Sequence, residues 1–351
     1  MPSLADLPAV EALRRALRLD PQAMRAVRTA LYKRFADDAA VLRAIPEPQR
    51  SAFAEQAALH CLTLHDRRDS QHDGASKLLF RTAGGALLET VILRIASGRT
   101  SLCLSSQVGC AAACTFCATG QLGIVQHLTV DEILDQCVQA GQLLAHEGRQ
   151  ARNLVFMGMG EPFHNEEPLH AALRALTAPE LFHHPPHRIL VSTVGIPDAM
   201  VRCAQRFPQV RLALSLHSVE PAVREQLIPL ARKYPLDALR QALRAVHRAQ
   251  GPRTSVMIEY LTLDGLNDQP HDARRLAEWL AGLRVHVNLI PYNPIAGAEG
   301  LRSSDRSRRD AFAAVLRDAG YPTTVRYSLG SDIAAACGQL AKAARGRGPA
   351  S

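Results

Sequence analysis

The sequence has no apolar segment that could cross a membrane. The 351-residue chain contains no run of about 18 uninterrupted apolar residues. Its first residues alternate charge with apolarity, where a secretion signal would have an apolar core. Internal repeats and low-complexity segments are also absent from the sequence. Hydrophobic residues make up 47% and charged residues 21%, which excludes disordered, collagen-like and coiled-coil proteins. We therefore predict a globular cytoplasmic protein without membrane contact.

Lysine is scarce in this chain. Of the 41 basic residues, only Lys33, Lys77, Lys233 and Lys342 are lysines, and the remainder are arginines. The formal net charge of +8 permits a polyanionic partner such as nucleic acid. A coding bias toward alanine and arginine explains the arginine content at least as well. Composition alone therefore leaves the partner open.

Three patterns follow one another along the chain. Residues 1–75 show rough helical spacing interrupted by prolines, which predicts a small helical N-terminal domain. Two apolar runs on either side of a Gly-Gly turn predict a β-ribbon linker over residues 76–98. Strands then alternate with helices over residues 99–344, which predicts an α/β fold with a partial (β/α)6 barrel. A disordered tail is expected at residues 345–351. The predicted barrel strands cover residues 154–158, 189–193, 212–216, 256–260, 285–290 and 323–327.

Unusual polar groups follow several of these predicted strands. They lie at residues 158–162, 192–193, 215–217 and 292–294. In barrels of parallel strands, chemistry gathers where the strands end. We therefore expect a ligand site at the carboxyl ends of the strands.

Four of the eight cysteines fall within residues 103–117. The chain is long and shows no secretion signal, so metal or redox chemistry is a better explanation than a disulfide framework. Cys110, Cys114 and Cys117 form a CxxxCxxC run, and three thiolates on one short loop can hold three corners of a [4Fe-4S] cube. The fourth iron would then be open. A structural zinc site is the alternative, but it needs four ligands and the sequence offers no second Cys pair.

The CxxxCxxC run, with Phe116 before its last cysteine, resembles the signature of radical S-adenosylmethionine (SAM) enzymes. The surrounding sequence is similar to the RNA adenosine methyltransferases that methylate amidine carbons. The matching segments occur in family order and comprise residues 88–91, 103–110, 117–120, 156–162, 191–195, 214–217, 288–294 and 332–340.

The resemblance implies a mechanism that uses SAM twice. One SAM methylates Cys337, and a second is cleaved by the cluster to a radical that activates the S-methyl group for addition to adenine. Glu89 then matches the general base that deprotonates the protein–RNA adduct. Cys103 matches the resolving thiol, which forms a transient disulfide with Cys337. Read without the resemblance, Cys337 would be a small buried hydrophobe, Cys103 a fourth cluster ligand and Glu89 a solvated carboxylate.

The resemblance also assigns cofactors and partners. Cys110, Cys114 and Cys117 would bind the [4Fe-4S] cluster, whose open iron chelates SAM. The expected SAM-binding residues are Gly160, Glu161, Ser192, Ser215, Leu216, His217 and Asn293. The expected partners are RNA (23S rRNA, with tRNA as a second possibility), docked partly by the N-terminal domain, and an electron donor such as flavodoxin or ferredoxin. We expect a monomer.

The target carbon stays open between C2 and C8 of adenine. Tyr327 and Leu329 stand where the housekeeping C2 branch has arginines, whereas residues 117–120, 128–133, 207–210 and 215–218 look closer to the chloramphenicol-florfenicol resistance C8 enzyme. Two other classes are consistent with the cluster motif. One is a radical SAM enzyme acting on a small molecule or peptide, and the other is an inactive iron-sulfur RNA-binding protein. The combination of Glu89, Cys103 and Cys337 disfavours both.

Overall fold

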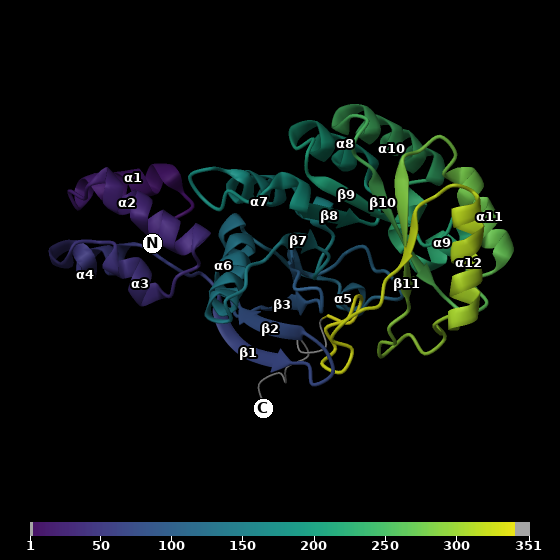
Figure 1. The fold of residues 1–351 in the computed structure, drawn as a ribbon, viewed down its shortest axis with the longest axis horizontal. Coiled ribbons are helices and arrows are strands. Elements are labelled where there is room, and N and C mark those ends of the chain that lie inside the picture. The colour runs from purple at the N-terminus through teal and green to yellow at the C-terminus, as the bar shows by residue number, and fades with distance from the viewer. Residues whose placement is uncertain (1–2, 341–351) are drawn as a thin grey trace.

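A computed structural model describes residues 3–340 and begins with a helical unit (Figure 1). It contains α1 (Leu7–Ala16), α2 (Pro21–Arg28), the π-helical turn η1 (Thr29–Lys33), α3 (Asp38–Arg43) and α4 (Glu47–Gln56). Asp6, Asp20 and Asp37 cap three of these helices by accepting backbone N–H donors of the first turn. This confirms the predicted helical character of residues 7–56.

One open sheet of ten strands carries most of the described chain. Its first three strands, β1 (Thr63–Asp69), β2 (Ala75–Arg81) and β3 (Leu87–Arg94), are antiparallel. β3 pairs antiparallel with β4, the first of seven mutually parallel strands. In order, the parallel strands are β4 (Thr100–Cys103), β7 (Asn153–Phe156), β8 (Ile189–Thr193), β9 (Arg211–Ser215), β10 (Val256–Thr262), β11 (Val285–Pro291) and β12 (Thr323–Val325). The predicted α/β class with a partial barrel is confirmed.

Helices connect the parallel strands and cover the outer face of the sheet (Figure 1). They are α6 (Val130–His146), α7 (Glu166–Thr177), α8 (Pro197–Arg206), α9 (Pro221–Leu227), α10 (Leu236–Gln250), α11 (Pro270–Trp279) and α12 (Arg306–Asp318). Such crossovers are required because parallel strands cannot be joined by a tight turn. Each predicted barrel strand lies within two residues of an observed one. Their apolar side chains form the main core.

Two expectations about the chain before the barrel need correction. Residues 63–69 form strand β1 and not a helix, because their backbone pairs with β2. Their mostly exposed, charged side chains do not alternate between buried and exposed, so the sequence pattern did not indicate a strand. The sequence also did not predict β4, through which the ribbon continues the barrel sheet. The predicted disordered tail, 345–351, lies outside the described residues.

Asp135 on α6 anchors the segment that leaves the helical unit. Its buried carboxylate accepts hydrogen bonds from the backbone N–H groups of Cys61 and Leu62, both at 2.8 Å. His60 contacts the same carboxylate through Nδ1 at 2.6 Å, and its Nε2 reaches Asp38 on α3 at 2.9 Å. His60 therefore bridges the helical unit and the barrel.

A close packing contact supports this anchorage. The ring of Phe35 lies against Gly141 on α6, where a Cβ atom would approach the ring to 2.3 Å. Phe35 and Tyr32 also contact the ring of Phe182, with centroids 6.2 and 4.8 Å apart. Glycine at residue 141 thus allows the helical unit to sit directly on α6. None of the helices within residues 3–340 combines the length and apolarity needed to cross a membrane.

The His60 bridge predicts a pH dependence of stability. Burial lowers the pKa of His60, but the hydrogen bonds and charges of Asp135 and Asp38 outweigh burial and raise it from 6.5 to about 9. The bridge therefore stabilises the fold fully below pH about 6.5, and this contribution is lost as the pH rises through about 9. His60→Ala should cost on the order of 2–3 kcal/mol of unfolding free energy more at pH 6 than at pH 9.5, measured by urea denaturation. Replacing the exposed His271 by Ala is the control, and a pH-independent loss for His60→Ala would contradict the assignment.

Candidate functional site

The three motif cysteines lie on a loop between two short elements, β5 (Gln107–Gly109) and α5 (Ala118–Gln121). β5 pairs with β6 (Ile124–His127), and the loop is fixed at both ends: Cys110 N–H donates to the Gly123 carbonyl and Thr115 N–H to the Leu227 carbonyl. A second apolar cluster surrounds it, formed by Cys110, Ala112, Cys114, Leu227, Ile228, Ala231, Leu261, Leu263, Ile290 and Tyr292. The cysteines are thus held in an apolar setting at the carboxyl ends of the strands.

The cysteine loop fits a cationic cluster. Burial raises the pKa of Cys110 to about 12 and raises that of Cys114 well above its usual value. A bound cationic metal centre reverses this, because coordination stabilises the thiolate. Within residues 3–340, no three His, Cys, Asp or Glu side chains gather closely enough to hold one metal ion. Three thiolates can each bind one iron of a cube, whereas a structural zinc ion needs four ligands.

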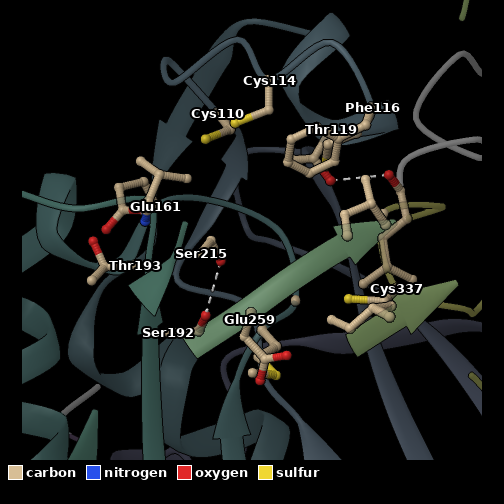
Figure 2. A pocket seen from close by; sticks show the side chains of 18 of the residues that line it. Cys110, Cys114, Phe116, Thr119, Glu161, Ser192, Thr193, Ser215, Glu259 and Cys337 are labelled. Carbon is tan, nitrogen blue, oxygen red and sulfur yellow. Dashed lines mark hydrogen bonds between the residues drawn. The ribbon is translucent and has the colours of Figure 1, made fainter. Parts of the chain in front are cut away.

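The cysteine loop forms one wall of a cavity at the carboxyl ends of the strands (Figure 2). Its lining includes most of the predicted ligand residues: Cys110, Cys114, Cys117, Gly160, Glu161, Ser192, Ser215, His217 and Cys337. We call it the SAM cavity. Ser192 and Ser215 approach each other to 3.4 Å between their Oγ atoms. Figure 2 shows Cys337 across the cavity from Cys110.

Glu161 is a buried carboxylate at the end of β7. Its Oε2 accepts from Val194 N–H at 2.9 Å and its Oε1 from Phe163 N–H at 3.1 Å. Burial raises its pKa to about 7, although these backbone hydrogen bonds favour the charged form. A cationic ammonium in the cavity would stabilise the carboxylate.

Two glycines bring this loop close to its neighbours. At Gly158 a Cβ would lie 2.7 Å from the Leu104 carbonyl oxygen, and Gly160 has a φ of +99° with Gln107 within 2.8 Å of an added Cβ. Side chains at these positions would push the strand end away. Gly158 and Gly160 are therefore required for the close packing of this loop, in addition to lining the cavity.

His217 is a neutral, fixed ring in the cavity wall. Its Nδ1 accepts from Leu261 N–H at 3.0 Å, which leaves the proton on Nε2. Burial, aided by the charge of Arg224, lowers its pKa to about 3. The ring meets Phe116 edge-on at 4.7 Å. His217 can therefore offer one N–H donor near the cysteine loop.

Two predicted SAM residues do not line the SAM cavity. Leu216 is fully buried in the main core, so its side chain does not face a ligand. Asn293 instead donates from Nδ2 to the Cys337 carbonyl and to Ser328 Oγ, both at 3.0 Å. It supports the loop that carries Cys337.

Residues 326–340 follow β12 and run back to the ribbon, and we call this segment the Cys337 loop. On the cluster side, Ala118 N–H donates to the Gly338 carbonyl at 2.7 Å, and Thr119 Oγ1 donates to the Leu340 carbonyl at 3.0 Å. On the ribbon side, Asp332 accepts from Ser70 and Asp73 accepts from Gly330 N–H at 2.8 Å. The loop therefore spans the open side of the sheet.

Cys103 and Cys337 line a second, smaller cavity, which we call the thiol cavity. Both are free thiols. Burial, with a contribution from Cys337, raises the pKa of Cys103 to about 12. Cys337 is exposed as a residue, but desolvation by the groups packed around its thiol raises its pKa as well. The guanidinium of Arg326 acts in the opposite direction on both thiols. Cys337 belongs to both cavities and so connects them.

Glu89 lies on the same face of the sheet as Cys103. Lys77 pairs with Val91 across the ribbon and Val91 pairs with Cys103, so their side chains share one face with that of Glu89. Glu89 is buried, and its Oε1 lies 3.0 Å from Lys77 Nζ. Lys77 also donates to the Ala334 carbonyl at 3.1 Å. The ion pair thus ties Glu89 to the Cys337 loop.

Ser105 joins the ribbon to the SAM cavity. Its hydroxyl donates to the Glu89 carbonyl at 2.6 Å and accepts from Met159 N–H at 2.8 Å. The side-chain amide of Gln136 on α6 accepts from Ser105 N–H at 2.9 Å and donates to the Ser105 carbonyl at 3.0 Å. Ser105 therefore positions both the backbone of Glu89, the predicted base, and the backbone of Met159 beside the SAM cavity.

Sequence reasoning missed several charged residues in this region. Lys77 and Glu259 each interrupt a buried apolar strand, a signal that sequence analysis could have used. Glu259 lines the SAM cavity and accepts from Asn288 at 2.7 Å, and burial raises its pKa. Arg224 is buried and donates to the carbonyls of Val194 and Leu216. Its sequence context on α9 carries no such signal.

The fold and cysteine loop correspond to a known superfamily. Residues 104–279, half of the chain, match the family described as the Radical SAM superfamily. The protein is therefore a member of the Radical SAM superfamily. Membership implies a [4Fe-4S] cluster and SAM as cofactors.

Relatives over nearly the full chain define the family more closely. A probable RNA methyltransferase of Rhodopirellula baltica is 54% identical over 331 residues, covering 94% of this chain and 85% of its own length. The dual-specificity RNA methyltransferase RlmN of Sorangium cellulosum is 39% identical, with 88% and 87% covered. A crystal structure of a radical SAM methyltransferase from Sphaerobacter thermophilus superposes with a TM-score of 0.89 at 38% identity, with 96% and 97% covered. The chain belongs to the radical SAM RNA methyltransferase family, as its resemblance predicted.

The Lys77–Glu89 pair predicts a large, partner-dependent effect on stability. Lys77→Met should lower the free energy of unfolding by about 3–5 kcal/mol, because it leaves a buried carboxylate without its cation. The double variant Lys77→Met/Glu89→Leu should recover much of the loss, since no isolated charge remains. Urea denaturation measures both, and Lys233→Met, at an exposed lysine, is the control. A loss below about 1 kcal/mol for Lys77→Met would show that the pair does not hold this region together.

Proposed function

We propose that this protein methylates a carbon of an adenosine in RNA, with Cys337 as the residue that carries the methyl group. The observation that supports this most is the position of Cys337. Its side chain lines the cavity of the cysteine loop and also the cavity that contains Cys103. A small-molecule radical SAM enzyme has no need of a second thiol at that position.

The SAM cavity supplies the groups that cofactor binding requires. Cys110, Cys114 and Cys117 would hold the cluster, and Glu161 would face the ammonium of SAM. Ser192, Ser215 and His217 offer hydroxyl and N–H groups to its remaining polar atoms. When bound, the cofactors supply one-electron chemistry that can remove a hydrogen atom from a methyl group.

The protein's own residues would act in sequence. The Cys337 sulfur accepts a methyl group, and after loss of one hydrogen atom the methyl carbon, now a radical, bonds to adenine. The resulting radical adduct must also lose one electron, for which the cluster, when bound, would be the acceptor. Glu89, held beside Lys77, removes the proton from the substituted adenine carbon. The Cys103 thiolate then attacks the Cys337 sulfur and breaks the bond from that sulfur to the methylene carbon. The departing carbon takes up a proton, which releases the methylated RNA and leaves a disulfide between Cys103 and Cys337. Arg326 favours the thiolate that this attack requires.

The finer assignments belong to this proposal. We infer that the RNA is 23S rRNA or tRNA, as the sequence resemblance implies. The name of the RlmN relative, a dual-specificity RNA methyltransferase, supports an RNA substrate. Each turnover consumes two SAM molecules, and a flavodoxin- or ferredoxin-type protein supplies the electron. The enzyme acts as a monomer. Both C2 and C8 of adenine are compatible with this site.

Transfer of a labelled methyl group tests the function. Anaerobically reconstituted protein, incubated with methyl-labelled SAM, a reductant and total RNA, should place label on a carbon of adenine in rRNA or tRNA. Mass spectrometry of the nucleosides identifies the carbon. The matched control replaces Cys110, Cys114 and Cys117 by Ala, and should lose cluster iron, SAM cleavage and RNA label together. Label found only on an adenine nitrogen, or only on a small molecule or peptide, would refute the proposal.

The two other cysteines should fail at different stages. Cys103→Ala should still acquire S-methylcysteine at residue 337 and then accumulate a covalent protein–RNA species, because no thiol can release it. Glu89→Ala should accumulate the same species, since the adduct cannot lose its proton. Cys337→Ala, alone or with Cys103→Ala, should form none. A slow, RNase-sensitive band on a denaturing gel is the measurement. Loss of the cluster from Cys103→Ala would show instead that Cys103 is an iron ligand.

A further inference from the structure

A third cavity lies at the opposite end of the barrel from the SAM cavity. It is lined by residues from the beginnings of strands, such as Asn153 on β7, Arg211 on β9 and Met257 on β10. The SAM cavity takes residues from the ends of the same strands, such as Ser215 on β9 and Leu261 on β10. The third cavity has a volume of about 400 Å³, within the range of ligand pockets. We call it the basic cavity.

The basic cavity is a hollow where a barrel would ordinarily be filled. Layers of side chains usually pack the interior of parallel barrels. Here the inward-facing Val155, Leu190 and Met257 are only partly buried, although they belong to central strands of the sheet. Leaving apolar side chains partly uncovered lowers stability. A ligand that covers them on binding would account for the open space.

The lining carries positive charge only. Arg188, Arg211 and Arg326 line the cavity with His187, and its lining includes no Asp or Glu. Among residues 3–340, neither Arg188 nor Arg211 takes part in an ion pair. Glu259, which acts electrostatically on Arg326, lines the SAM cavity instead. The basic cavity is therefore suited to an anionic ligand.

An aromatic side chain stands at the same cavity. Tyr327 is 60% exposed, and Ile95, also in the lining, is 39% exposed. They are two of five large hydrophobic side chains exposed in the described part of the chain. Exposed aromatic rings beside arginines are the usual platform for unpaired nucleobases.

The basic cavity also adjoins the two thiols. Leu93, Arg326 and Leu329 line both the basic cavity and the thiol cavity. Cys337 in turn lines both the thiol cavity and the SAM cavity. The three spaces therefore follow one another through the barrel, with the thiols in the middle. A ligand in the basic cavity would therefore lie next to the cavity that contains Cys103 and Cys337, with SAM in the cavity on its other side.

We propose that the basic cavity binds single-stranded RNA around the target adenosine, so that RNA and SAM approach Cys337 from opposite ends of the barrel. Arg188 and Arg211 neutralise phosphates, and Tyr327 stacks on an unpaired base. The interior of the barrel excludes a duplex, so the target must be unpaired or flipped out. This inference rests on the proposed function and adds the location of the substrate site.

RNA binding by the protein without cofactors tests the site. The probe is a fluorescent single-stranded RNA oligonucleotide containing one adenosine, followed by anisotropy at several salt concentrations. Arg188→Ala/Arg211→Ala should bind more weakly, and its plot of log affinity against log salt should be shallower by about 0.7 per lost phosphate contact. Tyr327→Ala should bind on the order of tenfold more weakly with an unchanged slope, and Tyr327→Phe should bind like wild type.

Matched controls separate the site from general surface charge. Arg244→Ala/Arg248→Ala removes two exposed arginines from α10, outside the basic cavity, and should leave RNA binding unchanged. Methylation of Cys337 from SAM, measured by mass spectrometry without RNA, should be normal in every cavity variant, since the SAM cavity is intact.

The outcomes distinguish this inference from the proposed function. Equal weakening by the α10 and cavity variants, or normal RNA binding by the cavity variants of an enzyme that methylates RNA, would overturn the site alone. Loss of Cys337 methylation in the cavity variants would show that the basic cavity serves SAM. A wild-type protein that transfers methyl groups to a peptide or small molecule and binds no RNA would overturn both.

Discussion

The seating of the Cys337 loop across the open side of the sheet is the constraint on which the rest of the site depends. The sheet does not close, and the loop crosses its open side with hydrogen bonds to the cysteine loop at one end and to the ribbon at the other. Three residues with predicted catalytic roles, from distant parts of the chain, are thereby brought into one region. Cys337 comes to lie between the cavity of the cysteine loop and the thiol of Cys103, and Lys77 ties Glu89 to the same loop. Without this crossing, Glu89 and Cys103 would share a sheet face with no thiol opposite them.

Much of the architecture was predictable because it depends on local patterns. Alternating apolar runs and helices located the barrel strands, and the cysteine spacing pointed to a loop that forms one wall of the SAM cavity. Charged segments defeated the same reasoning. β1 is an edge strand that pairs through its backbone, and its charged residues, the half-buried Asp66 and the exposed Arg67 and Arg68, gave no periodic signal. Leu216 shows a further limit: it follows β9 directly, and the motif does not say that its side chain is buried in the core while that of Ser215 lines the cavity.

The parts of the site that sequence could not supply are those made by long-range contacts. The contact of Lys77 with both Glu89 and Ala334 joins residues that are 12 and 257 positions apart. The basic cavity is composed of single residues from successive strands, no two of which form a motif. What identifies it is a collective property, namely that its lining has several arginines and no acid. Such a property exists only once the sheet has folded.

Two neighbouring residues of α6 have a consequence for how this protein can be divided. Asp135 accepts hydrogen bonds from backbone N–H groups of the segment that leaves the N-terminal helices. Gln136 forms two hydrogen bonds with the backbone of Ser105, which contacts Glu89. Removing residues 1–62 would expose the side of α6 that the helical unit covers. The Asp135 carboxylate would then lose its contacts with His60 and with the backbone N–H groups of Cys61 and Leu62. The barrel is therefore not an independent module, and joining it to a different N-terminal unit would require new contacts that cover α6.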